Sequence, residues 1–461
     1  MKRLWVHALA LVLVAALSPS CGSKKKHPSP APEGPLLLRA APAQSFHEAT
    51  PVGSSIYFTY DDGAHWPQVW KSDGTRSGTS LLKLLAQGAV NPAPSGLVAV
   101  GTTLFFVADD GIHGSELWRS DGTEEGTVLV KDINPGPAAG AQFAGAAFGP
   151  ELFFRGDDGA GHVGLWKTDG SEAGTLFVAP VSPGGGTAGS PIFASAGGLL
   201  FFWGYDPAHG TELWRSDGSP EGTFIPKESL PGPDSGTLGN LVSTGDRVFY
   251  SGYDATDGIE PWMSDGSEAG TRRVANLRSG NGGSSPRLFT RAGALVYFVA
   301  TDDSGFEDLW QTDGSPAGTR KVQPSATVWA PLYTFNGSVP PAALGNALFY
   351  SAGDALSGNE LWKTDGTTEG TVRVLDLQPG TVGSNPVALA AIGSHLYFAA
   401  DDGTIGRELW RTDGTANGTS LVVDLAPGSA SSSPNTILLA GSNLFFAGDD
   451  GSGLSLWRIA P

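Results

Sequence analysis

The chain has 461 residues, a formal net charge of −18, 66 glycines, 33 prolines and 10% aromatic residues. So many aromatic residues exclude a disordered chain, and the Gly and Pro content favours short strands joined by tight turns. Residues 33–461 carry a charge of −23, which would repel phosphate backbones and excludes nucleic acid as a partner.

The first twenty residues have the pattern of an export signal. A basic start precedes an apolar stretch over residues 4–17, and small residues lead to Cys21. The stretch is too short for a comfortable membrane span, so residues 1–20 are predicted to be a signal peptide. The segment resembles a bacterial lipoprotein signal, in which the cysteine is lipidated. Ser18 stands where that signal usually has leucine and also suits an ordinary signal peptidase, so a secreted chain is the alternative.

Residues 21–34 are predicted to be a flexible tether rich in Lys, Pro and Ser. With a lipid on Cys21, this tether would hold the body at a membrane without spanning it. Cys21 is the only cysteine, so no intrachain disulfide can form. We expect an exported, monomeric lipoprotein in the periplasm or at the cell surface.

A tryptophan recurs through the rest of the chain, 35–461, at intervals of 48 residues five times, then 52, 48 and 47. A fixed period of this length indicates a repeat architecture, with one supersecondary unit in each repeat. The recurring residues are Trp70, Trp118, Trp166, Trp214, Trp262, Trp310, Trp362, Trp410 and Trp457.

One repeat, residues 95–133, shows what a unit contains. Four short strands, here called a to d, are predicted at "SGLVAVG", "TLFFVADD", "ELWRSDG" and "GTVLVKDI". Four strands in about 48 residues are typical of one β-propeller blade. The run 104–107 is apolar without alternation, as expected of a strand covered on both faces by neighbouring blades.

The two ends of the repeat region predict how the propeller closes. The last unit, "NLFFAGDDGSGLSLWRIAP", stops after strand c, and "EGPLLLRAAPAQSF" at 33–46 looks like a d strand with its following loop. An N-terminal strand would therefore complete the last blade and leave no unpaired edge. The sequence predicts an all-β fold, a single closed propeller of about nine four-stranded blades, with eight as the alternative.

The stretch "ELWRSDGTEEGT" at 116–127 can be assigned to packing and turn chemistry. Trp118, in strand c, is large and flat enough to fill the gap between neighbouring blades. Asp121 and Gly122 begin the c–d turn, because Asp binds backbone groups ahead of it and Gly accepts a positive φ. Gly126 would let the backbone bend back into strand d.

These repeats resemble those of the bacterial ELWxxDGT-repeat proteins, which are extracytoplasmic. The full motif occurs as "ELWRSDG" at 116–122 and 212–218, "ELWKTDG" at 360–366 and "ELWRTDG" at 408–414. The repeats cover almost all of the chain after residue 33. The family is defined by its repeat, so the resemblance implies an extracytoplasmic protein and no particular reaction.

The loops between strands b and c carry recurring carboxylates, on the same rim as the d–a loops. They could bind Ca²⁺, which prefers several oxygen ligands, or they could form tight Asp-Gly turns. No loop has the D-x-D-x-D-G pattern of a known calcium loop, and no cofactor is expected beyond this calcium alternative. The acidic residues are Asp61, Asp62, Asp109, Asp110, Asp157, Asp158, Asp206, Asp254, Asp302, Asp303, Asp354, Asp401, Asp402, Asp449 and Asp450.

Four histidines, His65, His113, His162 and His209, fall in this loop of successive blades. Equivalent positions lie about a blade width apart, too far to share a zinc ion that needs ligands at about 2 Å. We predict that these histidines are surface loop residues.

A ligand site on a symmetric scaffold must break the symmetry, so departures from the repeat are candidate binding residues. If exposed, aromatic residues beside carboxylates and amides suit sugars or peptides, whereas the alternative is sequence drift with local repacking. Arg155 and Trp203 stand at the position of Val107, and Tyr205 and Tyr253 at that of Asp109. The long d–a loop 324–342 adds Trp329, Tyr333 and Phe335.

The sequence has no convergent catalytic motif: no G-x-S-x-G, no P-loop, no H-E-x-x-H and no cysteine in the body. We therefore expect a non-enzymatic envelope scaffold that binds a polysaccharide or a protein. A polysaccharide hydrolase or lyase using acidic residues of the rim is one alternative, since carboxylates are abundant. A purely structural envelope protein is the other.

Overall fold

The computed structural model describes residues 36–40, 46–86, 90–183, 193–234, 239–322, 339–354 and 356–460. All of them belong to one contact-defined unit, Gly34–Pro461. Throughout these described ranges the regular elements are strands, and no helix is long and apolar enough to cross a membrane.

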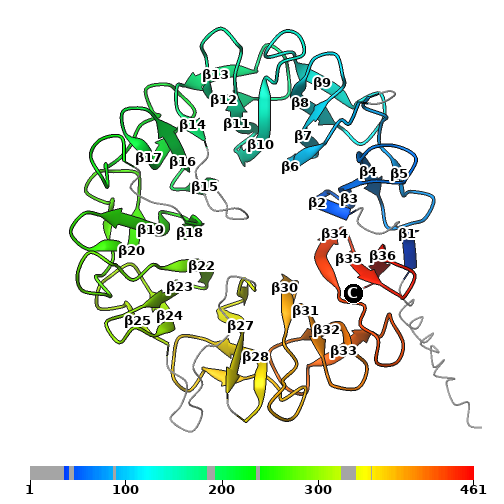
Figure 1. Ribbon diagram of the computed structural model, residues 1–461, viewed down its shortest axis with the longest axis vertical. Coiled ribbons are helices and arrows are strands. Elements are labelled where there is room, and N and C mark those ends of the chain that lie inside the picture. Colours follow the sequence, from blue (N-terminus) through cyan, green and yellow to red (C-terminus); the bar gives the residue numbers. More distant parts are fainter. Residues whose placement is uncertain are drawn as a thin grey trace, which may run out of the picture. The chain divides into compact units, whose positions relative to one another are not determined.

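The strands form nine antiparallel sheets of four strands each, arranged radially as the nine blades of a propeller (Figure 1). The prediction of nine blades is confirmed, and the alternative of eight is wrong. The inner strands, a, are β2 (Phe46–Val52), β6 (Ser95–Val100), β10 (Ala141–Phe148), β15 (Phe193–Ala196), β18 (Val242–Ser243), β22 (Arg287–Ala292), β26 (Ala342–Leu344), β30 (Val387–Ile392) and β34 (Asn435–Ala440). The b strands are β3 (Ser55–Tyr60), β7 (Thr103–Asp109), β11 (Glu151–Gly156), β16 (Leu199–Asp206), β19 (Val248–Asp254), β23 (Leu295–Thr301), β27 (Ala347–Asp354), β31 (His395–Asp401) and β35 (Asn443–Asp449).

Strands c and d complete each blade on its outer side. The c strands are β4 (Gln68–Ser72), β8 (Ser115–Ser120), β12 (Gly164–Thr168), β17 (Gly210–Ser216), β20 (Gly258–Ser264), β24 (Glu307–Thr312), β28 (Gly358–Thr364), β32 (Arg407–Thr412) and β36 (Leu454–Ile459). The d strands are β5 (Ser80–Leu81), β9 (Val128–Lys131), β13 (Leu176–Ala179), β21 (Arg272–Arg273), β25 (Arg320–Lys321), β29 (Val372–Arg373), β33 (Ser420–Val423) and β1 (Leu36–Ala40). Blades 1 to 9 are numbered from β2 along the chain.

Blade 9 contains both ends of the repeat region. β1 pairs antiparallel with β36, with Leu37 opposite Trp457, and completes the sheet β1-β36-β35-β34. Leu38 of β1 is buried in one cluster with Ile56 of blade 1 and Phe445 of blade 9. The predicted closure by an N-terminal strand is confirmed, and it leaves the ring without a free blade edge.

Blade 4 departs from the common pattern. Its inner position is shared by β14 (Ser182–Pro183) and β15, which both pair with β16. Its d strand is reduced to a single bridge between Arg215 and Phe224. The short strand β14, which follows blade 3 in the sequence, therefore joins the sheet of blade 4.

The b strands are buried on both faces, as their continuous apolar sequences predict. In β7, Leu104 and Phe106 pack against blade 1, whereas Phe105 and Val107 pack against blade 3. Successive side chains of a strand point to opposite faces, so each b strand needs apolar residues at every position when both faces are covered.

Each recurring tryptophan lies between two blades. Trp118 is 7% exposed and packs in a cluster that includes Tyr57 and Val69 of blade 1. Its indole Nε1 donates a hydrogen bond to the Ala108 carbonyl oxygen over 3.2 Å. The tryptophan thus contributes apolar contact to the neighbouring blade and a polar contact to its own.

The Asp-Gly-Thr segment closes the c–d turn. Asp121 Oδ1 accepts hydrogen bonds from the Thr123 backbone N–H and hydroxyl at 2.9 and 2.7 Å, and Gly122 has a φ of +93°. A Cβ on Gly126 would lie 2.0 Å from Asp121 Oδ1. Glycine is therefore needed at 126 for room beside the carboxylate, a reason that differs from the backbone bend expected from the sequence.

Candidate functional site

The b–c loops and the d–a segments lie together on one face of the ring, here called the loop rim. In blade 2 the Asp109 N–H donates to the Pro92 carbonyl, and the Gly140 N–H donates to the Ser115 carbonyl. The a–b and c–d turns form the opposite face, the turn rim, where Asn443 Nδ2 donates to the Asp73 carbonyl of the next blade.

Exposed apolar side chains gather on the loop rim. Of the large hydrophobic residues that are exposed in the described ranges, most lie in or beside the b–c loops and d–a segments, and none lies in an a–b or c–d turn. Those on the loop rim are Trp66, Leu84, Val90, Ile112, Val163, Tyr205, Ile259, Phe306, Leu356 and Val382. Single exposed apolar residues are ordinary on a protein surface, but three of these, Trp66, Leu84 and Val90, line one hollow of the rim and so mark a candidate binding site.

The recurring carboxylates of this rim are engaged in turns. Asp109 Oδ1 accepts the Gly111 N–H at 2.7 Å, and Asp110 Oδ1 accepts the Ile112 N–H at 2.9 Å. In other blades, equivalent hydrogen bonds from backbone N–H groups are accepted by Asp61, Asp62, Asp157, Asp158, Asp401, Asp402, Asp449 and Asp450. In the part of the chain that the structure describes, no three His, Cys, Asp or Glu side chains group together in a way that could hold a metal ion. Calcium binding stays the alternative to the turn role of these carboxylates.

The four loop histidines each pair with an aspartate of their own loop. His113 Nδ1 lies 2.7 Å from Asp110 Oδ2, and this hydrogen bond raises the pKa of His113. His162 Nδ1 lies 2.6 Å from Asp158 Oδ2, a bond that lowers the pKa of Asp158 to about 2. His65 and His209 make the equivalent contacts with Asp62 and Asp206.

Five blades hold the d–a segment against the b–c loop through a glycine and a glutamate two residues apart. In blade 2, Glu116 Oε1 accepts the Asn134 N–H at 3.1 Å, and a Cβ on Gly114 would lie 2.5 Å from the Ala138 carbonyl oxygen. The equivalent pairs are Gly210 and Glu212, Gly258 and Glu260, Gly358 and Glu360, and Gly406 and Glu408. The glutamate of the ELW motif is therefore an anchor for the d–a segment.

These glutamates are buried in an apolar environment. Glu116 is 0% exposed, and burial raises its pKa to about 7 in spite of the backbone hydrogen bonds that favour the carboxylate. Burial also raises the pKa of Glu212, Glu260 and Glu360.

Blades 1, 3 and 6 replace both members of the pair. The glycine is replaced by Trp66, His162 or Phe306, and the glutamate by Gln68, Gly164 or Asp308, respectively. A bulky side chain cannot occupy the space that glycine leaves against the d–a backbone. In these blades the b–c loop therefore presents that side chain outwards, with Trp66 49% and Phe306 73% exposed.

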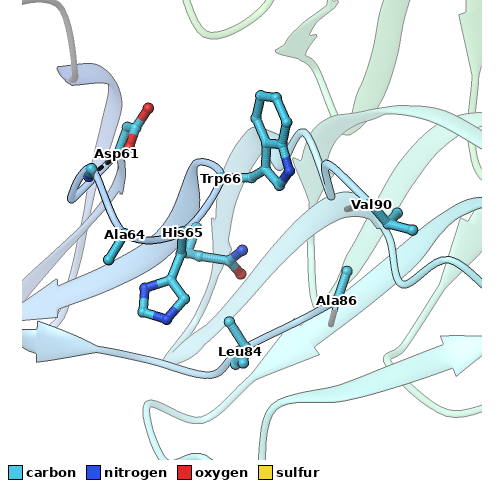
Figure 2. Close-up of a pocket in the computed structure, with 9 residues that line it drawn as sticks. Asp61, Ala64, His65, Trp66, Leu84, Ala86 and Val90 are labelled. Carbon is cyan, nitrogen blue, oxygen red and sulfur yellow. Dashed lines mark hydrogen bonds between the residues drawn. The ribbon is translucent and has the colours of Figure 1, made fainter. Parts of the chain in front are cut away.

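In blade 1 this replacement forms a pocket of about 320 Å³. Figure 2 shows Asp61, His65 and Trp66 from the b–c loop, with Leu84, Ala86 and Val90 from the segment after β5. Gln68 also lines the pocket, and its Oε1 accepts a hydrogen bond from the Leu85 N–H at 3.1 Å. An indole, an imidazole, an amide and a carboxylate thus line one opening on the loop rim.

The residues that break the repeat in blades 3 to 5 differ in exposure. Trp203 is 0% exposed, packs edge-to-face on Tyr250 and donates from Nε1 to the Gly239 carbonyl. The expectation that Trp203 is an exposed aromatic is wrong, because its position faces the next blade, as that of Val107 does. Tyr205 is 48% exposed, and Arg155 and Tyr253 are partly buried. Trp329, Tyr333 and Phe335 lie outside the described residues.

The sequence reasoning missed Trp66 and Phe306. Both stand where six other blades have glycine, so they are departures from the repeat of the kind that was sought in strand b. The replacement of glycine could be seen in the sequence. Its consequence could be understood only once the structure showed that this glycine contacts the d–a segment.

Comparisons with known proteins found similarities among solved structures, all of them at low sequence identity. No protein-family model matches the chain, and no curated protein matches it. Among solved structures, puromycin hydrolase is 16% identical with a TM-score of 0.36 over 77% of this chain, which spans 58% of that protein. A prolyl endopeptidase is 10% identical with a TM-score of 0.42, over 88% of this chain and 54% of that one. An uncharacterized protein, lmo1340, from Listeria monocytogenes is 8% identical with a TM-score of 0.39, over 84% and 97%.

Proposed function

We propose that this propeller is a non-enzymatic binding scaffold of the cell envelope, and that its loop rim holds a polysaccharide or a protein. The observation that carries the proposal is the blade 1 pocket of the loop rim, which the exposed residues Trp66, Leu84 and Val90 line. About half of the Trp66 side chain is exposed to solvent, and this exposed part of the indole offers a flat apolar surface on which a ligand can stack.

A polysaccharide is the first ligand class to test. Trp66 offers a flat ring to a sugar face, and Asp61, His65 and Gln68 offer hydrogen-bonding groups around the same pocket. Mixed aromatic and polar linings of this kind fix the orientation of a polar ligand.

The alternative of a hydrolase or lyase has less support. Glu116, whose pKa burial raises to about 7, has the protonation behaviour of an acid catalyst, but it is fully buried and binds the d–a segment. A catalytic acid must reach the substrate, and this carboxylate is buried against the d–a segment.

We place the protein at a membrane through a lipid on Cys21, with secretion as the alternative. β1 begins at the turn rim, where Arg76 Nε donates to the Leu37 carbonyl over 2.9 Å. Cys21→Ser should move the protein from the membrane fraction to the soluble fraction, and unchanged partitioning would contradict lipidation.

The test of the binding proposal is a glycan array together with a pull-down from envelope extracts. Trp66→Ala should reduce binding at least tenfold without lowering the Tm, because the side chain is exposed. Leu176→Ala is the matched control, since Leu176 is 50% exposed on the outer strand β13, away from the loop rim. Equal binding by the wild type and Trp66→Ala, or equal losses in both variants, would contradict the proposal.

A further inference from the structure

The interface between blades 3 and 4 contains an arginine without a partner. Arg155 of β11 lies opposite Leu165 of β12, and opposite residues of paired strands share a face of the sheet. Leu165 is buried in a cluster with Leu200 and Phe202 of blade 4. The side chain of Arg155 therefore faces blade 4, where the equivalent residue of blade 2, Val107, packs against blade 3 in an apolar cluster.

Arg155 differs from two other arginines that have a buried nitrogen. Its Nε is buried and has no hydrogen-bond partner. Arg215 also has an unpaired buried Nε, but its guanidinium lies 4.1 Å from the centre of the Phe224 ring. Arg287 has its Nη2 at 2.7 Å from Glu307. Of these three, Arg155 has neither an ion pair nor an aromatic face, and a buried donor without an acceptor is costly.

Trp214 brings a second unpaired donor to this interface. It packs against the same cluster as Leu165, from the side of blade 4. Its Nε1 is buried without a partner, whereas Trp118, Trp310 and Trp410 donate from Nε1 to a carbonyl of their own b strand.

Unpaired indoles occur elsewhere, but not opposite an arginine. Trp262 and Trp362 also have an Nε1 without a partner. Trp262 of blade 5 faces blade 4, where Trp203 stands at the position equivalent to Arg155. Trp362 of blade 7 faces blade 6, where Val299 stands at that position. Among the described residues, Trp262 has the ammonium of Lys227 5.8 Å from its ring centre, whereas Trp214 has the arginine Arg155 on the facing strand of blade 3.

We propose that Arg155, with Trp214 Nε1, binds a single carboxylate group of the ligand on the loop rim. Arg155 is two residues before Asp157 of the b–c loop, so the site lies at the rim end of the strand. A planar guanidinium matches a carboxylate in a bidentate arrangement. The net charge of −18 disfavours a polyanion, so the ligand is one with an isolated carboxylate in a mostly neutral molecule.

The carboxylate could come from a sugar acid or from the C-terminus of a peptide, and small probes separate these sources. Calorimetric titration with methyl glucuronide and with N-acetylglycine tests the two acids. Methyl glucoside and N-acetylglycinamide are the neutral controls. We expect at least one acid to bind and both neutral probes to fail, and the acid that binds identifies the source.

Arg155→Gln should weaken binding of that acid by roughly tenfold or more, the loss expected for a hydrogen bond to a charged group. Arg119→Gln, which changes an exposed arginine of blade 2, should bind as the wild type does. Arg155→Gln should also keep the wild-type Tm, because Arg155 has no partner to lose. Failure of both acids to bind, or equal binding by Arg155→Gln, would overturn the proposal.

This inference rests on the proposed function, yet the two can fail separately. If the envelope pull-down depends on Trp66 while neither acid binds, the carboxylate site is wrong and the scaffold proposal stands. If an acid binds through Arg155 while Trp66→Ala changes nothing, the carboxylate site stands and the role of the blade 1 pocket is wrong.

Discussion

Gln68 accepts a hydrogen bond from the Leu85 backbone N–H over 3.1 Å, in the place where five other blades use a glutamate. In blade 2, for example, Glu116 accepts the Asn134 N–H over 3.1 Å. A neutral amide oxygen therefore performs the same anchoring in blade 1 that a buried carboxylate performs in blade 2. The two differ in charge, and that difference is measurable.

Glu116→Gln should make the stability less dependent on pH. Burial raises the pKa of Glu116 to about 7 in the folded chain, against about 4.3 for an unperturbed glutamate. The folded state thus binds more protons between these values, so this group's contribution to stability falls as the pH rises from 4.3 to 7. Between pH 5 and pH 8 the wild type should lose on the order of 1–3 kcal/mol more than the variant.

Urea unfolding at the two pH values measures this difference. Gln68→Glu is the reciprocal control and should add a pH dependence of the same sign. Parallel pH profiles for the wild type and Glu116→Gln would show that the buried carboxylate does not titrate in this range.

Gly126→Ala should destabilise the c–d turn of blade 2. A Cβ at this position would lie 2.0 Å from Asp121 Oδ1, so either the Asp121 side chain or the backbone must move. Loss of the Asp121 bonds to Thr123 and local overpacking should cost roughly 1–3 kcal/mol in the free energy of unfolding. Gly282→Ala is the matched control, because a Cβ there would have no atom within 4 Å and its φ is not positive. An equal Tm for both variants would contradict this account of the turn.

Trp203→Ala should lower the stability, and any loss of binding should follow from unfolding. Trp203 is fully buried beside Tyr250, and its Nε1 bonds the Gly239 carbonyl over 2.6 Å. Removing a buried tryptophan costs about 3–5 kcal/mol. Thermal unfolding of Trp203→Ala and Trp66→Ala should separate a core residue from a surface one. A wild-type Tm for Trp203→Ala would mean that the ring is exposed after all.

The architecture could be predicted because it depends on signals that are local or periodic. Strand order, the buried run 104–107 and the Asp121-Gly122 turn follow from neighbouring residues, and the tryptophan period gives the number of blades. Closure could be predicted because the segment that contains β1 has the sequence of a missing d strand.

The site could not be predicted in the same way, because it depends on contacts between segments that are distant in sequence. The role of Glu116 appears only when Asn134, eighteen residues later, is seen to donate to it. Trp203 was misjudged because a departure from the repeat was taken as a sign of exposure, whereas the burial of a strand position is set by the neighbouring blade. Trp66 was missed because the glycine that it replaces contacts a segment distant in sequence, as Gly114 contacts the Ala138 carbonyl in blade 2.

EDTA should leave the Tm unchanged, whether or not millimolar Ca²⁺ is present beforehand. The loop aspartates are already acceptors for backbone N–H groups, as Asp109 is for Gly111 and Asp402 for Thr404. These bonds hold the loops without an ion. Differential scanning calorimetry with and without EDTA gives the result directly. A lower Tm in EDTA that Ca²⁺ restores, but Mg²⁺ does not, would instead support a calcium site.

Deleting β1 should destabilise the ring far more than deleting the tether. A chain that begins at Phe46 lacks the strand that pairs with β36, so it leaves a free edge and uncovers the surface around Trp457. Leu38 alone, 6% exposed, accounts for about 1.5–3 kcal/mol of buried side chain. A chain that begins at Gly34 keeps β1 and should unfold at the temperature of the signal-free protein. Adding a peptide of residues 34–45 to the shorter chain should restore part of its Tm, because the peptide can pair with the open edge of β36. If both truncated chains unfold at the same temperature, the last blade does not need its N-terminal strand. The ring is then held by the contacts between blades alone.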